Sequence, residues 1–330
     1  MAFVFNMQML LVSNKEMTQN KRNFKERFIE MLREEPANWK KNLTTNGSPV
    51  NLISERAYSG FNLFLLQEKM GKLHSNDPRF VTFNQANDAG YMVQKNAKSV
   101  CIEYYTYCNC KTKEPILLKD LAKERAKLPA GIIKGTPHPA YLFNITELER
   151  GDRAPYHPKK MNTEAILQKM ADSIDLPVIF SNVSEPCYNV DKDLLLLPKC
   201  DTDKNLLLFP KTDTEDKEVY FTKFLLAICE ATGYKGRCEK RFPYEKDKKM
   251  LTKEHFIIDL ASCILCSALR LKNNIMLSDP EDVLTYILWD ESFFREALVA
   301  ATKTVNKLLC LPDLAEELII SKTLVERETM

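Results

Sequence analysis

The segment that most constrains the fold is DLASCILCSAL at residues 259–269, because it reads as a helix that is apolar on nearly every side. A helix of that kind is buried, so its Cys263 and Cys266 are predicted to pack in a core. This helix is predicted to span 252–271, and apolar residues at helical spacing also recur at 216–232 and 280–309, with a break near Trp289-Asp290. The last third of the chain is therefore predicted to contain three helices.

Earlier segments mix both kinds of structure. Helices are expected at 23–35, at 60–71 with Gly71 as the left-handed end, and at 163–174. Alternating apolar residues predict strands at 99–110 and 140–145, and VDKDLLLLPK at 190–199 returns as TDKNLLLFPK at 202–211, which indicates a hairpin or a doubled edge strand. The predicted fold class is α+β.

Charge divides the chain into two parts. Residues 1–150 hold 22 Lys or Arg against 15 Asp or Glu, whereas 151–330 hold 25 against 30. The polar segment GDRAPYHPKK at 151–160 is interpreted as a linker between domains at 21–150 and 161–330. Residues 1–20 are interpreted as a leader, disordered or untranslated, because their apolar run lacks the charged start of a signal peptide. The basic part is the candidate for a polyanionic partner.

Cysteine usage indicates where the protein works. The ten cysteines are too few for a disulfide scaffold in a chain of 330 residues, and several lie in apolar runs typical of buried thiols. A reducing cytoplasm is therefore predicted. No run approaches the ~20 apolar residues of a membrane span, so no membrane partner is expected.

Motifs for metal or nucleotide chemistry are weak. Cys108 and Cys110 form C-x-C, which leaves both ligation and packing open, and the C-x-x-C of Cys263 and Cys266 favours packing. The four histidines have no metal-binding spacing, and phosphate-loop, dinucleotide and serine-esterase motifs are absent from the sequence. No cofactor is predicted.

Aromatic residues alternate with cations in the basic part, as in Trp39-Lys40 and Arg79-Phe80. Single-stranded nucleic acid is held by this combination, because cations neutralise phosphates and rings stack on unpaired bases. The same pattern arises when the rings are core and the cations flank them. Composition leaves both interpretations open.

Two longer motifs point to a family. PVNLISERAYSGFNLFLL at 49–66 resembles the P-x-N-x-x-T-G-x-x-Y-x-G-x-N-x-x-L signature of ArdC-like antirestriction proteins. DPRFVTFNQANDAGYMVQKNAKS at 77–99 resembles that family's P-R-W-x-T-x-x-Q-A-x-x-x-G-x-x-V-x-K-G-x-K-G. The resemblance implies an N-terminal domain that binds single-stranded DNA and protects an incoming strand from restriction. The matching positions are Pro49, Asn51, Tyr58, Gly60, Asn62, Pro78, Arg79, Thr82, Gln85, Ala86, Gly90, Val93, Lys95 and Lys98.

The sequence departs from these motifs at three glycine positions and at the tryptophan. Glu55 replaces a glycine of the first motif, Phe80 replaces the tryptophan of the second, and Asn96 and Ser99 replace its two late glycines. Phenylalanine keeps a ring for stacking, whereas Glu55 lowers the local positive potential. The residues predicted to face DNA are Trp39, Lys40, Arg56, Tyr58, Asn62, Arg79, Phe80, Lys95 and Lys98.

The resemblance continues into the second half, where such proteins carry a zincin-like metallopeptidase core with H-E-L-x-H-W-T-G on a helix. Alignment of Ala231-Thr232-Gly233 with W-T-G places Leu226 and Glu230 at the two histidines and Ala227 at the general base. Leucine offers no lone pair to a metal, and the base must be a carboxylate. No catalytic residue and no metal site are therefore predicted. The residual metal candidates are Glu230, Asp259 at the position resembling the third ligand, and His255.

Three functions follow. The first is a single-stranded-DNA-binding antirestriction protein whose peptidase-like domain is a catalytically dead scaffold or partner surface. The second is an active metallopeptidase whose ligands this alignment misplaces. The third is a protein-binding module that sequesters a restriction or host factor through its acidic second half.

Overall fold

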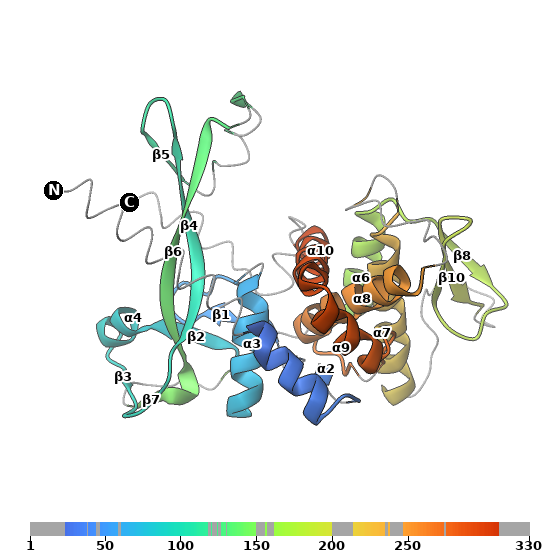
Figure 1. Ribbon diagram of the computed structural model, residues 1–330, viewed down its shortest axis with the longest axis horizontal. Coiled ribbons are helices and arrows are strands. Elements are labelled where there is room, and N and C mark those ends of the chain that lie inside the picture. The colour runs from blue at the N-terminus through green and yellow to red at the C-terminus, as the bar shows by residue number, and fades with distance from the viewer. Residues whose placement is uncertain are drawn as a thin grey trace. The chain divides into compact units, whose positions relative to one another are not determined.

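The computed structural model describes residues 24–37, 39–43, 47–58, 61–117, 120, 124, 127–129, 131–149, 156, 162–199, 214–234, 237, 247–273 and 275–309. The described residues contain a run of strands at 79–149 and a run of helices at 214–309, which confirms the α+β class (Figure 1). The predicted leader, most of the linker and the second repeat copy at 202–211 lie outside the described residues.

The chain forms two compact units. Unit 1 contains Phe80–Asp152, and unit 2 contains Phe28–Arg79 and Arg153–Lys322. One break between them falls inside the predicted linker 151–160. The segment Phe28–Arg79 was expected in the first domain but lies in unit 2, because the rings at its start pack on the helices of that unit, as described below.

Unit 1 is built on an antiparallel sheet whose strands differ in length. Its strands run in the order β2-β6-β4-β5, and a separate pair is formed by β3 and β7. Thr82 and Gln85 form a capping box at the start of α4, which fixes the turn out of β2. The elements are β2 (Arg79–Thr82), α4 (Phe83–Asp88), β3 (Met92–Val93), β4 (Val100–Asn109), β5 (Pro115–Ile116), β6 (Ile133–Asn144), η2 (Ile145–Glu147) and β7 (Leu148–Glu149).

The predicted strand 99–110 is confirmed as β4, but β6 begins at Ile133 and not at residue 140. Gly135, Pro137 and Pro139 in its first half are typical of loops, which concealed this part of the strand. Proline is tolerated there because the edge of β6 that faces away from β4 pairs with β2 at Leu142–Asn144, so no backbone N–H is required for pairing with β2 at Pro137 or Pro139.

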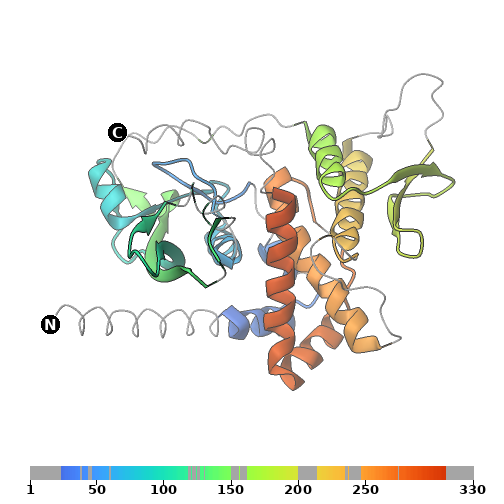
Figure 2. The same cartoon turned by 90° about the horizontal axis from the view of Figure 1, so that it is seen from above.

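Unit 2 is mainly helical. In it α8 is the central helix and is buried along most of its length, with α7 and α10 packed against it (Figure 2). This confirms the buried helix predicted at 252–271 and the break at Trp289. The helices are one at 24–34, whose first residues belong to unit 1, then α2 (Trp39–Leu43), α3 (Phe61–Leu73), α6 (Thr163–Asp172), α7 (Thr214–Ala231), α8 (Lys248–Leu269), α9 (Pro280–Trp289) and α10 (Glu291–Leu309).

Two details differ from expectation in α3 and α8. The helix α3 does not end at Gly71 but continues to Leu73, and His74 is the residue with positive φ (48°). The α8 helix starts early because the Asp247 carboxylate accepts from the Lys249 backbone and caps it. Cys263 and Cys266 are fully buried, which confirms packing, and burial raises the pKa of the Cys266 thiol to about 12.

A small sheet accompanies the helices of unit 2. Its order is β8-β10-β9, with β10 parallel to β8 and antiparallel to β9. The first repeat copy supplies β10. The strands are β8 (Val178–Ser181), β9 (Cys187–Asn189) and β10 (Leu194–Pro198); a short strand β1 (Val50–Asn51) lies earlier in the chain.

An aromatic cluster forms the core where the earliest residues of unit 2 meet its late helices. The Phe28 ring lies 5.0 Å from that of Trp39 and 5.2 Å from that of Phe294, and the Trp39 ring lies 6.0 Å from that of Phe256, between centroids. Burial of these rings is what places the segment after Phe28 in unit 2. None of the described helices combines the length and the apolar composition that a membrane crossing requires.

Candidate nucleic-acid surface and peptidase-like helices

Three of the residues predicted to face DNA are buried. Trp39 is in the aromatic cluster, Phe80 is in β2 with no exposed surface, and Lys40 is almost completely enclosed. A ring that has no exposed face cannot stack on a base. These three predictions are therefore wrong, and the alternative, rings as core, holds at these positions.

Lys40 has an internal partner. Its Nζ lies 2.9 Å from Oδ1 of Asp259, and the two side chains are 3% and 0% exposed. The same ammonium donates to the backbone oxygen of Ile275 at 2.5 Å. Both charged groups are buried and paired with each other, so neither is available to a ligand.

Arg79 is also engaged within the protein. Its Nε and Nη2 donate to the Asp77 carboxylate at 2.9 and 2.6 Å, and its guanidinium lies 5.7 Å from the centre of the Tyr156 ring. The bidentate pair holds the guanidinium in place and neutralises its charge. Arg79 is half-buried and is a poorer phosphate ligand than the motif suggests.

Residues of the first motif build a tight loop. The Asn51 side chain accepts from the backbone of Ile53 and Ser54 at 3.0 and 2.9 Å, and its amide donates to the Tyr58 hydroxyl at 3.3 Å. Burial raises the pKa of Tyr58 to about 12. Tyr58 is half-buried, as is Asn62 on α3, so both are better placed to shape the loop than to stack on DNA.

Two of the residues that replace a motif glycine have positive φ angles, which explains why the family has glycine there. Glu55 has φ 54° and Asn96 has φ 72°, and both stand where the family has glycine. Glycine adopts this left-handed conformation without steric cost, and asparagine tolerates it better than glutamate does. The glycines of the motifs therefore reflect backbone geometry.

The remaining predicted cations are on the surface. Arg56 is exposed in unit 2, and Lys95 and Lys98 are exposed beside β3 in unit 1. These three residues keep the DNA-facing role as a prediction.

The helix aligned with the peptidase motif is α7. Leu226 and Ala227 are buried in apolar surroundings, and Glu230 is half-buried near the end of the helix. Loss of hydration, together with a smaller contribution from the charge of Glu254 on α8, raises the pKa of Glu230 to about 7. Glu230 is thus a carboxyl group with an acidic neighbour.

Asp259 is saturated by protein donors. Besides Lys40, its carboxylate accepts from the backbone N of Leu277 at 3.1 Å and of Ser278 at 2.9 Å, and from the Ser278 hydroxyl at 2.7 Å. His255 lies one turn earlier, and burial lowers its pKa despite the nearby Asp259 charge. Among the described residues no three His, Cys, Asp or Glu side chains gather as metal ligands would. Glu230, Asp259 and His255 are therefore not assembled into a site.

The segment after α7 has a structural role. The Thr232 hydroxyl donates to the Cys229 backbone oxygen at 2.6 Å and lies 3.1 Å from the Thr304 hydroxyl on α10. The Arg237 guanidinium donates to the Ala231 backbone oxygen at 2.9 Å and pairs with Asp193 at 2.6 Å. It caps the C-terminal end of the helix.

Sequence reasoning missed two features. Nothing in the sequence pairs Lys40 with Asp259, because 219 positions separate them. The exposed tyrosines of β4 had a signal in the run YYTY at 104–107, but alternation there predicted only a strand.

The fold and these residues define a two-unit α+β protein in which Asn51 and Tyr58 of the first motif are joined by a hydrogen bond, and in which α7 carries the apolar Leu226 and Ala227. The family model for the N-terminal domain of anti-restriction factor ArdC matches residues 18–131. This part of the chain is therefore similar to the N-terminal domain of ArdC.

Solved structures agree on the fold. The metal-free crystal structure of the antirestriction ArdC protein from the R388 plasmid superposes with a TM-score of 0.60 at 18% identity, covering 87% of this chain and 95% of that chain. Its Mn(II)-bound structure gives a TM-score of 0.57 at 18% identity, covering 87% and 96%. No curated protein sequence matches the chain.

The R388 protein binds Mn(II) in one of those structures, which raises the question of whether this chain fits a metal ion. The donors do not fit. Leu226 and Ala227 offer no ligand atom, and the Asp259 carboxylate is taken by an ammonium group and three hydrogen-bond donors. No chemistry is assigned to a metal here.

Proposed function

We propose that this protein binds single-stranded DNA and acts in antirestriction, protecting the DNA of a mobile element that enters a new host. The match of residues 18–131 to the N-terminal domain of anti-restriction factor ArdC carries the proposal. The excess of positive charge before residue 150 and the exposed Arg56, Lys95 and Lys98 support it.

We further propose that the peptidase-like part is not catalytic. The apolar Leu226 and Ala227 and the internal pairing of Asp259 support this, because a hydrolytic metal needs three donors, an open position and a base. Stoichiometric metal in the purified protein, measured by mass spectrometry, together with peptide hydrolysis, would favour the active metallopeptidase instead.

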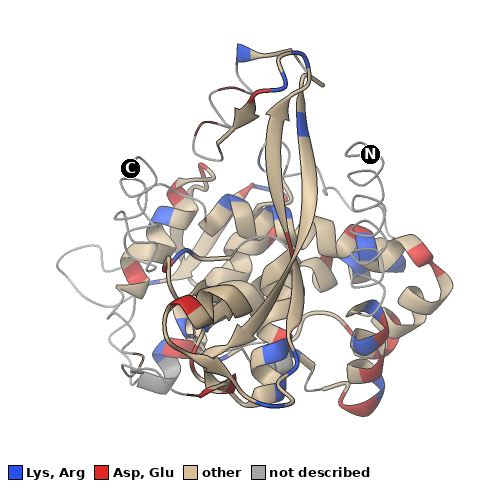
Figure 3. Cartoon of the chain, turned by 90° about the vertical axis from the view of Figure 1, so that its left-hand side faces the viewer, with Lys and Arg blue, Asp and Glu red and all other residues tan. Residues whose placement is uncertain are grey.

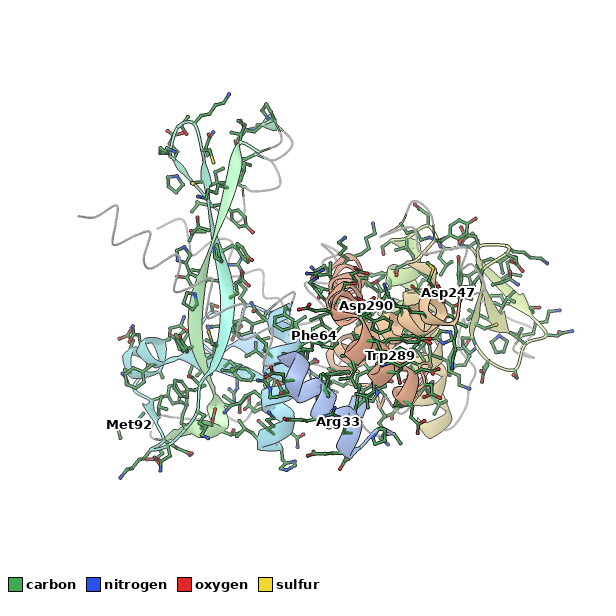
Figure 4. All side chains as sticks on the ribbon, in the orientation of Figure 1. Arg33, Phe64, Met92, Asp247, Trp289 and Asp290 are labelled. Atoms are coloured by element: carbon green, nitrogen blue, oxygen red, sulfur yellow. The ribbon has the colours of Figure 1, made fainter. Side chains whose placement is uncertain are left out.

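A third prediction, a protein partner for the acidic part, has one supporting residue. Trp289 at the end of α9 is 81% exposed (Figure 4). Large exposed rings are frequent in protein interfaces. A cytoplasmic location, supported by the buried thiols of α7 and α8, stays a prediction as well.

Fluorescence anisotropy of a labelled single strand tests the main proposal. The full-length protein should raise the anisotropy of a mixed-sequence single strand more than that of a duplex, with an affinity that falls steeply as salt increases. A single strand that tumbles freely at low salt contradicts the proposal.

A pair of matched lysine variants tests the role of charge. Lys95→Gln should lower the slope of log affinity against log salt by about 0.7, the value for one lost phosphate contact on a single strand. Lys307→Gln removes an equally exposed charge from α10 and should leave the slope unchanged. Equal slopes for the two variants would remove Lys95 from the interface.

A further inference from the structure

Strands β4 and β6 form a ribbon that extends beyond the rest of their sheet. They pair over ten rows, from Val100 opposite Leu142 to Asn109 opposite Ile133. The strand β2 pairs with β6 only from Leu142 onward, and β5 pairs with β4 only at Tyr107 and Cys108. Among the described residues, the middle of the ribbon therefore has two strands, and exposed side chains lie on both of its faces (Figures 1 and 4).

One face of the ribbon carries a row of rings. Side chains alternate between the faces of a strand, so Tyr105 and Tyr107 of β4 lie on the same side as Tyr141 of β6. Tyr105 and Tyr141 are each 46% exposed, and the rings of Tyr105 and Tyr107 stack with 6.2 Å between centroids and 23° between planes. These three tyrosines are called the tyrosine face. Tyr104, which is 50% exposed, lies on the opposite face.

Gly135 gives the rings their place on the ribbon. It is directly opposite Tyr107, and a Cβ added to it would lie 3.0 Å from the Tyr107 ring and 3.4 Å from the Tyr105 ring. Its φ lies outside the left-handed region, so the position needs glycine for space and not for conformation. The missing side chain lets both rings lie against β6, where they form a flat apolar surface in contact with water.

The charge of the segment identifies the kind of ligand. From Lys98 to Asn144 the sequence has eight Lys or Arg and four Asp or Glu. Lys111, Lys113 and Lys134 are exposed near the free end of the ribbon, where Figure 3 shows blue on an otherwise mostly tan ribbon. Rings with cations beside them fit a polyanion that has aromatic groups of its own.

Two further observations favour nucleic acid over an added peptide strand. Pro137 and Pro139 have no N–H, so they deny an added strand the regular hydrogen bonds it needs along β6. Glu103 shares the tyrosine face and accepts a hydrogen bond from the Tyr105 hydroxyl. A carboxylate beside the rings repels phosphate, so the bases and not the phosphates are expected to face the ribbon.

We propose that the tyrosine face of the β4–β6 ribbon is a stacking surface for the bases of single-stranded nucleic acid, with the phosphates directed to the flanking lysines. The inference rests on the proposed function and names a surface for it that neither family motif includes. Stacking tolerates every base, so the surface is expected to bind without sequence preference.

Anisotropy with the full-length chain and a labelled mixed-sequence single strand of DNA tests the face. Tyr105→Leu/Tyr107→Leu should weaken binding by at least about tenfold, because each stacked base contributes about fivefold or more and the variant removes two rings. Tyr105→Phe/Tyr107→Phe keeps the rings and should stay within about threefold of wild type. Tyr104→Leu, the matched control on the opposite face, should change binding by less than about twofold.

The outcomes separate the two proposals. No binding by the wild type removes single-stranded DNA binding as a whole. Wild-type binding with an unchanged Tyr105→Leu/Tyr107→Leu variant overturns the tyrosine face and leaves the proposed function standing. An equal loss in Tyr104→Leu also overturns it, because the effect is then not specific to one face. If the double variant does not fold, as judged by circular dichroism, Tyr141→Leu tests the same face and should weaken binding severalfold.

Discussion

The surroundings of Asp259 and the tyrosine face use similar side chains in opposite ways. At Asp259 a carboxylate, an ammonium group and backbone donors are removed from water and satisfy one another. On the ribbon, by contrast, the rings of Tyr105 and Tyr141 stay half exposed to water. The difference teaches that residue type alone does not distinguish a functional group from a structural one, whereas saturation by internal partners does.

The largest expected effect is at the ion pair. Lys40→Met should lower the free energy of unfolding by about 3–5 kcal/mol, because it leaves the Asp259 carboxylate buried without its cation. Urea denaturation monitored by circular dichroism measures it. Lys307→Met, on the exposed surface of α10, should change the same quantity by less than about 0.5 kcal/mol.

A second variant shows whether the loss comes from the uncompensated charge. Asp259→Asn removes that charge, so Lys40→Met should cost clearly less in the Asp259→Asn background than in wild type. If Lys40→Met unfolds at the same urea concentration as wild type, the ion pair contributes nothing and the contrast with the ribbon is lost.

Trp39 gives the next largest effect. It was predicted to stack on DNA and instead lies in the aromatic cluster with Phe28 and Phe256. Trp39→Leu should lower the free energy of unfolding by about 2–4 kcal/mol, since it opens a cavity in that core. Affinity for a single strand should stay at the wild-type value at temperatures where the variant is folded. Weaker DNA binding by a fully folded Trp39→Leu variant would restore the earlier prediction.

Glu230 should make stability depend on pH. Its pKa rises from 4.5 to about 7 on folding, so the folded state holds the proton more tightly between these values. Stability is therefore expected to fall as pH rises from about 4.5 to about 7, by on the order of 2 kcal/mol. Unlike Asp259, this carboxyl group loses hydration without gaining a cation and has an acidic neighbour, so its ionisation opposes folding.

The variant Glu230→Gln isolates this contribution. It should remove that part of the pH dependence and be more stable than wild type at about pH 8, with little difference at about pH 4. Urea midpoints across this range measure it. A wild-type slope that persists in Glu230→Gln would assign the pH dependence to another group.

Much of the fold could be predicted from the sequence, because periodicity reports burial directly. The apolar run around Cys263 and the alternation from Val100 gave α8 and β4. The site was harder. Whether Trp39 or Tyr105 is exposed depends on packing between segments far apart in the chain, which local pattern does not encode. The loss of a metal ligand at Leu226 and of the general base at Ala227 was visible in the sequence. The ion pair between Lys40 and Asp259 was not.

The smallest expected effect on stability is at the tyrosine face. Tyr105→Leu/Tyr107→Leu should change the free energy of unfolding by less than about 1 kcal/mol, because the Tyr105 ring is half exposed and leucine still covers Gly135. The same variant is expected to lose most of its DNA affinity. The tyrosine face should therefore affect binding and not stability, whereas Trp39 should affect stability and not binding. Thermal melts run beside the anisotropy titrations measure both. A double variant as destabilised as Trp39→Leu would mean that these exposed rings stabilise the ribbon, in the same way as the buried Trp39 ring stabilises the core.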